Sequence, residues 1–223
     1  MKLPDRKGDS PGIKLAAVIP MKSLAESKSR LAPLLDPRQR ASLSLNLLDL
    51  VLNAAVTSSL DRVIVLGGDE DVRSMASGRG VEWMSDSGGG LNQELSAALG
   101  RLSAASIASV YIPGDLPLLT ASDVEALIET SRGGELLTLC PAAEDAGTNG
   151  LVVPPSSPFR PTLGQDSFTR HLRAAEVAGL PHAVCNTPGF GLDLDSMADL
   201  EACERLQPGF IERMLGGPLE EQN

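Results

Sequence analysis

The chain has 223 residues, of which 42% are hydrophobic and 22% charged, a composition typical of one soluble globular domain. The formal net charge is −10 and the Lys and Arg residues are dispersed, so the chain lacks the basic face that a nucleic-acid-binding protein needs. No apolar run approaches the roughly 20 residues of a membrane span. We therefore expect neither nucleic acid nor a membrane among its partners.

The three cysteines show no pattern of a metal site. Cys140, Cys185 and Cys203 form no CxxC pair, and no histidine lies at zinc-ligand spacing from them. We predict that they are small buried residues in a reducing compartment, the cytoplasm.

The two ends of the chain set the domain boundaries. Residues 1–12 are polar, contain two prolines and two glycines, and lack the apolar core of a signal peptide, so we predict a disordered tail. The patterned part runs from residue 13 to residue 207, and we expect 208–223 to be a C-terminal tail. This organisation predicts one domain.

Strand-like and helix-like segments alternate along this domain. The apolar segment 14–20 ends in proline and indicates a buried strand. Asp36-Pro37 is typical of a helix N-cap followed by proline, and apolar residues at helical spacing continue that helix to about Thr57. The expected strands cover 14–20, 62–66, 81–84, 108–113, 136–140, 150–153 and 182–185. The expected helices cover about 37–57, 69–77, 91–104, 121–131, 166–178 and 196–206.

This alternation predicts the fold class. Strands that alternate with helices form a mostly parallel sheet with helices on both faces, which is a three-layer, Rossmann-like α/β domain. In such sheets the ligand lies beyond the carboxyl ends of the strands. The loops that should carry chemistry therefore begin at Met21, Ser85, Gly114 and Pro141.

Three aspartates are candidate metal ligands. Gly114–Pro117 places Asp115 at a strand end, although an aspartate that only forms a turn is the alternative. Asp193 and Asp195 are two residues apart, so on a strand they would face the same way. Asp195 could instead be the N-cap of the following helix. Magnesium prefers such carboxylate oxygens.

The loop after the first strand is basic. Lys22, Lys28 and Arg30 would suit a triphosphate, and a solvated basic loop is the alternative. The sequence contains no GxxxxGK motif, so this loop is not a P-loop.

Two further loops, Gly147–Gly150 and Gly164–Ser167, consist of small residues. The second leads into a helix, whose first amides and the Ser167 hydroxyl could bind a small anion. Capping of that helix by Asp166 or Ser167 is the alternative. His171 lies on the same helical face as Ser167 and either touches substrate or has a structural role.

Seven segments occur in one order over nearly the whole chain. They are Val18–Lys22, Lys28–Leu31, Leu91–Leu95, Gly114–Pro117, Gly147–Leu151, Gly164–His171 and Asp193–Asp195. In this order they resemble the 2-phospho-L-lactate guanylyltransferase family, which includes the phosphoenolpyruvate guanylyltransferases of coenzyme F-420 biosynthesis. The Gly-Thr-Asn loop combined with Gly-x-x-Ser-Phe-x-x-His is the most specific part. One departure is Thr162-Leu163, where the family often has a basic and then an aromatic residue.

The resemblance implies a nucleotidyltransferase domain of the glycosyltransferase-A type. It implies transfer of GMP from GTP to the phosphate of phosphoenolpyruvate or 2-phospho-L-lactate, with release of pyrophosphate. It implies Mg²⁺ bound by Asp115, Asp193 and Asp195.

The resemblance also implies roles for the remaining motif residues. The acceptor would be held by Thr148, Gly164 and Ser167. The nucleotide would be bound by Lys22, Lys28, Arg30 and Asn92, and the residues acting in catalysis would be Asp115, Lys22 and Arg30.

Two alternatives remain at this point. One is a nucleotidyltransferase of the same fold that acts on 3-phosphoglycerate, a sugar phosphate or molybdopterin. The other is a non-catalytic GTP-binding regulator. The sequence also leaves open whether the chain forms a homodimer.

Overall fold

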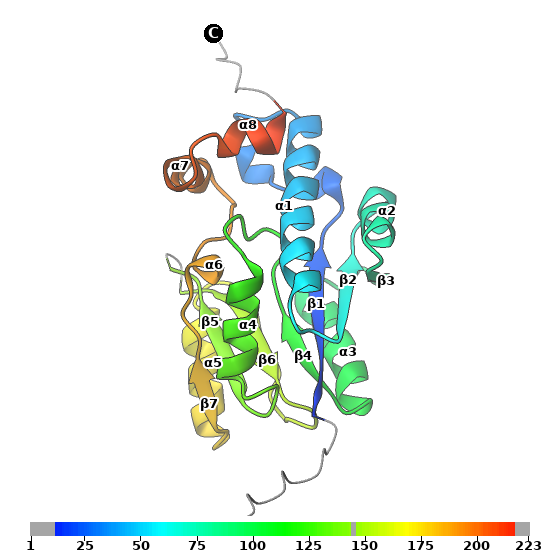
Figure 1. The fold of residues 1–223 in the computed structure, drawn as a ribbon, viewed down its shortest axis with the longest axis vertical. Helices are drawn as coiled ribbons and strands as arrows, with labels where there is room; N and C mark the ends of the chain where they lie inside the picture. The colour runs from blue at the N-terminus through cyan, green and yellow to red at the C-terminus, as the bar shows by residue number, and fades with distance from the viewer. Residues whose placement is uncertain (1–11, 144–145, 217–223) are drawn as a thin grey trace, which may run out of the picture.

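The fold is built on a seven-stranded sheet, seen in a computed structural model that describes residues 12–143 and 146–216. The strand order is β3-β2-β1-β4-β6-β5-β7 (Figure 1). β6 is antiparallel to both of its neighbours, and every other pair is parallel, so the mostly parallel sheet is confirmed. The strands are β1 (Lys14–Met21), β2 (Arg62–Gly67), β3 (Glu82–Met84), β4 (Ile107–Tyr111), β5 (Leu137–Pro141), β6 (Thr148–Val153) and β7 (His182–Val184).

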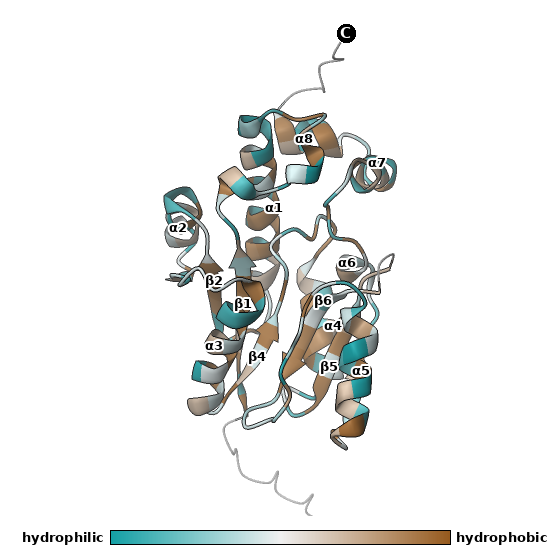
Figure 2. Ribbon diagram, turned by 180° about the vertical axis from the view of Figure 1, so that it is seen from behind, coloured by the Kyte–Doolittle hydropathy of each residue, from teal (hydrophilic) through white to brown (hydrophobic). Residues whose placement is uncertain are grey.

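Helices cover both faces of the sheet, as the sequence predicted. Helices α1, α4 and α6 lie over one face, and α3 and α5 lie over the other (Figures 1 and 2). The α-helices are α1 (Pro37–Thr57), α2 (Glu70–Gly78), α3 (Leu91–Ala104), α4 (Ala121–Thr130), α5 (Ser167–Val177), α6 (Pro188–Gly191), α7 (Met197–Leu206) and α8 (Phe210–Leu215). Two short 3-10 helices, η1 (Leu24–Glu26) and η2 (Ser29–Leu31), lie in the loop after β1.

The central strand β1 shows why the sheet is buried on both sides. Ala17 and Ile19 belong to the core under α1 and α4, while Ala16 and Val18 belong to the core under α3 and α5. All four side chains are fully buried. Because successive residues of a strand face opposite ways, a continuous apolar run fits only a strand with helices on both sides.

Two helix starts are fixed by local hydrogen bonds. Asp36 and Gln39 form a reciprocal capping box at the start of α1, with both hydrogen bonds at 2.9 Å. Thr120 is the N-cap of α4 and forms a second capping box with Asp123. Asp123 also accepts a hydrogen bond from the Gly189 amide, which joins α4 to α6.

The C-terminal part of the chain corrects one prediction. Residues 208–223 were expected to be a tail, but Phe210–Leu215 form α8. Phe210 is fully buried and packs with Leu43 and Leu47 of α1 and with Cys203 of α7. A helix of this length is too short to show apolar periodicity, so the pattern could not reveal it. The predicted tail at 1–12 lies outside the described residues, except for Gly12.

The antiparallel strand positions the candidate site. Because β6 runs against its neighbours, its first residues lie at the same edge of the sheet as the carboxyl ends of β1 and β4. That edge also receives the loop after β1 and the segment 192–196. In the part of the chain that the structure describes, no helix has the length and apolar character to cross a bilayer.

Candidate active site

Asp115 stands where β4 ends, in a tight turn. A Cβ atom on the preceding Gly114 would collide with the sulfur of Met21, so glycine allows the loops after β1 and β4 to approach each other. The Asp115 carbonyl accepts a hydrogen bond of 3.1 Å from the Leu194 amide. Asp115 is therefore joined to both the first and the last loop of the site.

Lys28 links two of the predicted metal ligands. Its Nζ lies 2.7 Å from Asp115 Oδ2 and 3.1 Å from Asp195 Oδ1. Its backbone is left-handed, with φ of 48°, and its side chain is only 6% exposed. Burial opposes protonation, but the charges of Asp115 and Asp195 outweigh it and raise the pKa of Lys28. Lys28 is thus a buried cation paired with two carboxylates.

Asp195 does not cap the helix that follows it. Ser196 is the N-cap of α7 and forms a capping box with Asp199, which also accepts from the Asp195 amide at 2.9 Å. The Asp195 carboxylate is therefore free of the capping role and meets Lys28. It also lies 3.7 Å from Nη1 of Arg30, whose side chain is 76% exposed.

Asp193 joins the same cluster. The sequence suggested a strand around Asp193 and Asp195, but this segment is not part of the sheet. Leu194, which stands between the two aspartates, is buried. Burial raises the pKa of Asp193, a 3.0 Å hydrogen bond from Asn149 lowers it in part, and the charges of Asp115 and Asp195 raise it further. The three carboxylates are thus close enough to repel one another.

The donor set of this cluster fits a divalent cation. Within the described residues no group of three His, Cys, Asp or Glu side chains is already arranged around a metal position, and Lys28 stands between Asp115 and Asp195. Asp193, however, accepts hydrogen bonds from the neutral amide side chain of Asn149 and from its own backbone, and it forms no ion pair with a described residue. Three carboxylates with Lys28 and the more distant Arg30 leave one excess negative charge on hard oxygen atoms, a donor type that suits Mg²⁺.

Thr148 and Ser167 are brought together, as the resemblance implied. Ser167 Oγ donates to Thr148 Oγ1 at 3.2 Å, and His171 Nδ1 lies 3.0 Å from the same Thr148 oxygen. The Thr162 amide donates to His171 Nε2 at 2.8 Å. The side chains of Thr148, Ser167 and His171 are buried. Burial, and then the charge of Arg170, lower the pKa of His171 to about 4, so the ring is neutral near pH 7.

The start of α5, beside this group, lacks the side-chain cap that was one interpretation of the sequence. Neither Asp166 nor Ser167 caps α5 through its side chain. The amides of Ser167 and Phe168 donate to the carbonyls of Gly164 and Ala146, so these two amides are already paired. An anion bound here would rely on side-chain hydroxyls. Gly164, with φ of 123°, adopts a conformation that favours glycine, and a Cβ there would meet only Arg170, at 4.0 Å.

Asn92 has a partner that the sequence did not suggest. Its Oδ1 accepts from the Leu163 amide at 2.7 Å, and its Nδ2 donates to the Leu163 carbonyl at 3.2 Å. Both ends of the amide expected to contact the base therefore bind the loop before Gly164. Leu163 and Thr162 use backbone atoms for their contacts with Asn92 and His171, so these contacts do not depend on which side chains stand at the two positions.

Lys22 and Arg30 are exposed at the entrance of the site. Lys22 forms no ion pair with any residue in the described ranges, so a ligand could reach its ammonium group. Asn149 belongs to the Gly-Thr-Asn loop, for which the sequence predicted no role at this position. In the structure its side-chain amide donates to Asp193. Its place directly after Thr148 was the only available signal.

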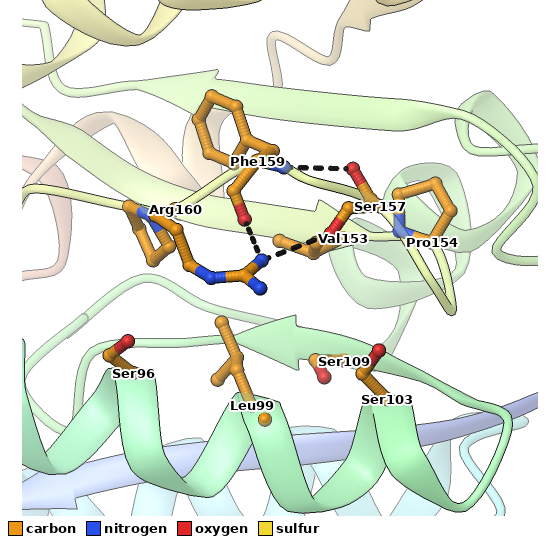
Figure 3. Close-up of a pocket in the computed structure, with 11 residues that line it drawn as sticks. Ser96, Leu99, Ser103, Ser109, Val153, Pro154, Ser157, Phe159 and Arg160 are labelled. Atoms are coloured by element: carbon orange, nitrogen blue, oxygen red, sulfur yellow. Dashed lines mark hydrogen bonds between the residues drawn. The ribbon is translucent and has the colours of Figure 1, made fainter.

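A small cavity elsewhere in the fold is not the substrate site. It lies between α3 and the segment 154–161, by the end of β6 remote from Thr148 (Figure 3). Ser96 and Leu99 line one side of it, and Arg160 lies across from them (Figure 3). Its volume of about 20 Å³ has room for a water molecule but not for a nucleotide.

Comparisons with known proteins agree with this architecture. A nucleotidyl transferase from Methanothermobacter has a TM-score of 0.61 at 17% identity and covers 91% of this chain and 100% of its own. A cytidylyltransferase from Leptospira borgpetersenii has a TM-score of 0.57 at 14% identity, covering 92% and 93%. At such identities these structures establish the fold, which is the nucleotidyltransferase fold of the glycosyltransferase-A type.

Proteins found by sequence comparison are more similar to this chain in sequence than these two structures are. A protein named phosphoenolpyruvate guanylyltransferase from Rubrobacter xylanophilus is 37% identical over 189 residues, which are 84% of this chain and 92% of that protein. A protein of the same name from Sphaerobacter thermophilus is 37% identical over 191 residues, covering 83% and 90%. The family model described as guanylyl transferase CofC like matches residues 15–204. The chain therefore belongs to the CofC-like guanylyl transferase family.

Proposed function

We propose that this enzyme transfers GMP from GTP to the phosphate of phosphoenolpyruvate or 2-phospho-L-lactate, releases pyrophosphate and serves coenzyme F-420 biosynthesis. The observation that carries the proposal is the meeting of Asp115, Asp193 and Asp195 with Lys28 at the sheet edge, next to Thr148 and Ser167. The names of the relatives favour phosphoenolpyruvate as the acceptor.

The reaction asks little of side-chain acid–base chemistry. A phosphate monoester has a second pKa near 6, so the acceptor is already an anionic nucleophile at neutral pH. One of its phosphate oxygens forms a bond to the α-phosphorus of GTP, the bond from that phosphorus to the β-phosphate oxygen breaks, and pyrophosphate leaves. The step therefore requires no general base.

The main barrier is the repulsion between two polyanions. Asp115, Asp193 and Asp195 would hold Mg²⁺, which when bound neutralises phosphate charge. Lys22, Lys28 and Arg30 lie on the loop after β1 and would bind the triphosphate. Their charges act on the oxygens that become more negative as pyrophosphate leaves.

The acceptor would bind on the other side of the cluster. The Thr148 hydroxyl offers a hydrogen bond without charge, Ser167 donates to that hydroxyl from the start of α5, and Gly164 leaves open space next to them. A carboxylate and a phosphate on adjacent carbons fit this combination, because one group can meet the hydroxyls while the other lies toward the aspartates. We place the enzyme in the cytoplasm, where its three free, buried cysteines would stay reduced.

One experiment tests the proposal directly. Purified protein is incubated with Mg²⁺, GTP or ATP, and phosphoenolpyruvate, 2-phospho-L-lactate or 3-phosphoglycerate, and pyrophosphate release and product mass are measured. We expect pyrophosphate and a guanylylated product with GTP and one of the first two acceptors. Transfer only to 3-phosphoglycerate, or GTP binding without pyrophosphate release, would contradict the proposal.

A further inference from the structure

His171 is a buried titratable side chain to which the proposed chemistry gives no part. The ring is 1% exposed, and both of its nitrogens are engaged. A backbone amide can only donate, so Nε2 must accept the hydrogen bond from Thr162. A neutral imidazole has one acceptor and one donor nitrogen, so the ring proton is on Nδ1 and is donated to Thr148 Oγ1.

The ring is also fixed in its plane. The aromatic ring of Phe159 packs edge-on against it, with centroids 5.5 Å apart and an interplanar angle of 68°. The amide of Thr162 holds one end of the ring and Thr148 holds the other. A flip of the ring would face the Thr162 amide with a carbon atom, so the structure selects one orientation and one tautomer.

This tautomer determines what the Thr148 hydroxyl can do. Its oxygen accepts one hydrogen bond from His171 and a second from Ser167. A hydroxyl has two lone pairs and one proton, and both lone pairs are now used. Thr148 can therefore act toward a ligand only as a donor. A hydroxyl limited to donating suits an anionic oxygen and disfavours a group that brings its own proton.

We infer that His171 is a positioning residue for the anionic acceptor, which it serves by holding the Thr148 hydroxyl as an obligate donor and by fixing the loop that leads to Gly164. The inference rests on the proposed function, because it takes the phosphorylated acid as the ligand of Thr148. His171 itself does not touch the substrate. It acts through Thr148 on one side and through the Thr162 amide on the other.

Two substitutions separate these two contacts. In His171→Asn, the new side-chain amide group would stand near the place of Nδ1 and could still donate to Thr148. In His171→Gln, the new side-chain oxygen would stand near the place of Nε2, accept from Thr162 and leave Thr148 without its donor. We expect His171→Gln to raise the KM of phosphoenolpyruvate about 10-fold or more, since the Thr148 hydroxyl is no longer held as a donor to the charged acceptor, and to leave the KM of GTP nearly unchanged. His171→Asn should change the acceptor KM by no more than about 3-fold.

The coupling with Thr148 supplies a readout that a merely structural role would not produce. Thr148→Val keeps the shape of the side chain and removes the hydroxyl, so it should also raise the acceptor KM. Adding His171→Gln to Thr148→Val should then cause no further rise. His182→Asn changes the other histidine, which lies on β7, and serves as the matched control with unchanged KM values.

Several results would overturn the inference. They are equal increases in the KM of GTP and of phosphoenolpyruvate, additive effects in the double variant, or no increase in His171→Gln. If that variant does not fold, the long-range ¹H–¹⁵N spectrum of the wild-type imidazole decides, because a proton on Nε2 would overturn the tautomer argument. Failure of the proposed function gives a different result from failure of this inference. If the proposed function is wrong, the wild-type protein itself transfers GMP to no phosphoacid.

Discussion

The two sides of the active site are held together by different forces. The aspartate side is charged, and Lys28 stands between carboxylates that are 31% and 45% exposed. The acceptor side is neutral and buried, and its hydrogen bonds join Thr148, Ser167 and His171. The two carboxylates are partly exposed, so water and ions can reach them, whereas a buried polar network must keep each partner. We expect the aspartate side to rearrange around its ligands and the acceptor side to be preformed.

The strongest test of the charged side is the loss of one carboxylate. Asp193→Asn should lower kcat/KM at least about 100-fold, because it would remove a proposed ligand of the charge-neutralising cation. Pyrophosphate release measured over a range of Mg²⁺ concentrations checks this. Asp49→Asn, which removes a carboxylate paired with Arg79 on the surface, is the control and should retain activity. Near-normal turnover of Asp193→Asn would remove this residue from the metal site.

The neutral side should make the free energy of unfolding depend on pH through His171. The pKa of His171 is about 4 in the fold and about 6.5 in an unfolded chain, so below pH 6.5 the unfolded state binds more protons. This contribution to stability is present above pH 6.5 and is lost as the pH falls toward 4. By pH 5 the loss amounts to roughly 2 kcal/mol.

Urea unfolding at pH 7 and pH 5 measures the change. The wild type should lose more free energy of unfolding between the two pH values than His171→Gln does, and the difference should be close to the value above. An identical pH dependence in both proteins would mean that His171 titrates normally and is not held in its neutral form.

Lys28 tests whether the charged side binds GTP and not the acceptor. Lys28→Met should raise the KM of GTP about 10-fold, since a cation beside the phosphates is lost, and should leave the KM of the acceptor nearly unchanged. Lys14→Met, which removes an exposed lysine at the far end of β1, is the matched control. A rise confined to the acceptor KM would move Lys28 to the other side of the site.

Asn92 should give the smallest effect. Its amide is bound to Leu163 in the structure, so Asn92→Ala should raise the acceptor KM about 3-fold, which corresponds to one exposed hydrogen-bonding group. The ratio of kcat/KM for GTP to that for ATP should not change. A fall in this ratio would instead assign Asn92 to the guanine base, as the resemblance implies.

Elements set by local interactions were predictable from the sequence. Asp36-Pro37 marks a helix start through contacts within three residues, and this prediction is confirmed. The strand order was not predictable, because the pairing of β4 with β6 depends on contacts between residues far apart in the chain. The antiparallel direction of β6 left no trace in its apolar pattern, since that strand is buried like the strands β4 and β5 on either side of it.

The candidate site divides in the same way. The motifs predicted which residues form it, and the structure does bring Asp115, Asp193 and Asp195 together. The motifs did not predict which side chains and backbone groups these residues contact. The left-handed backbone of Lys28 and the engagement of Asn92 by Leu163 depend on how separate loops meet, and no spacing along the chain encodes that.

The distance along the chain between Lys28 and Asp195, 167 residues, also has a consequence during synthesis. The ribosome releases the N-terminal part first, so the contact between Lys28 and Asp115 can form while the last loop is still unmade. Helices α7 and α8, which pack on α1 through Phe210 and Cys203, emerge later still. All seven strands are therefore synthesised before Asp193 and Asp195, so the three carboxylates can meet only after the segment that follows the sheet has left the ribosome.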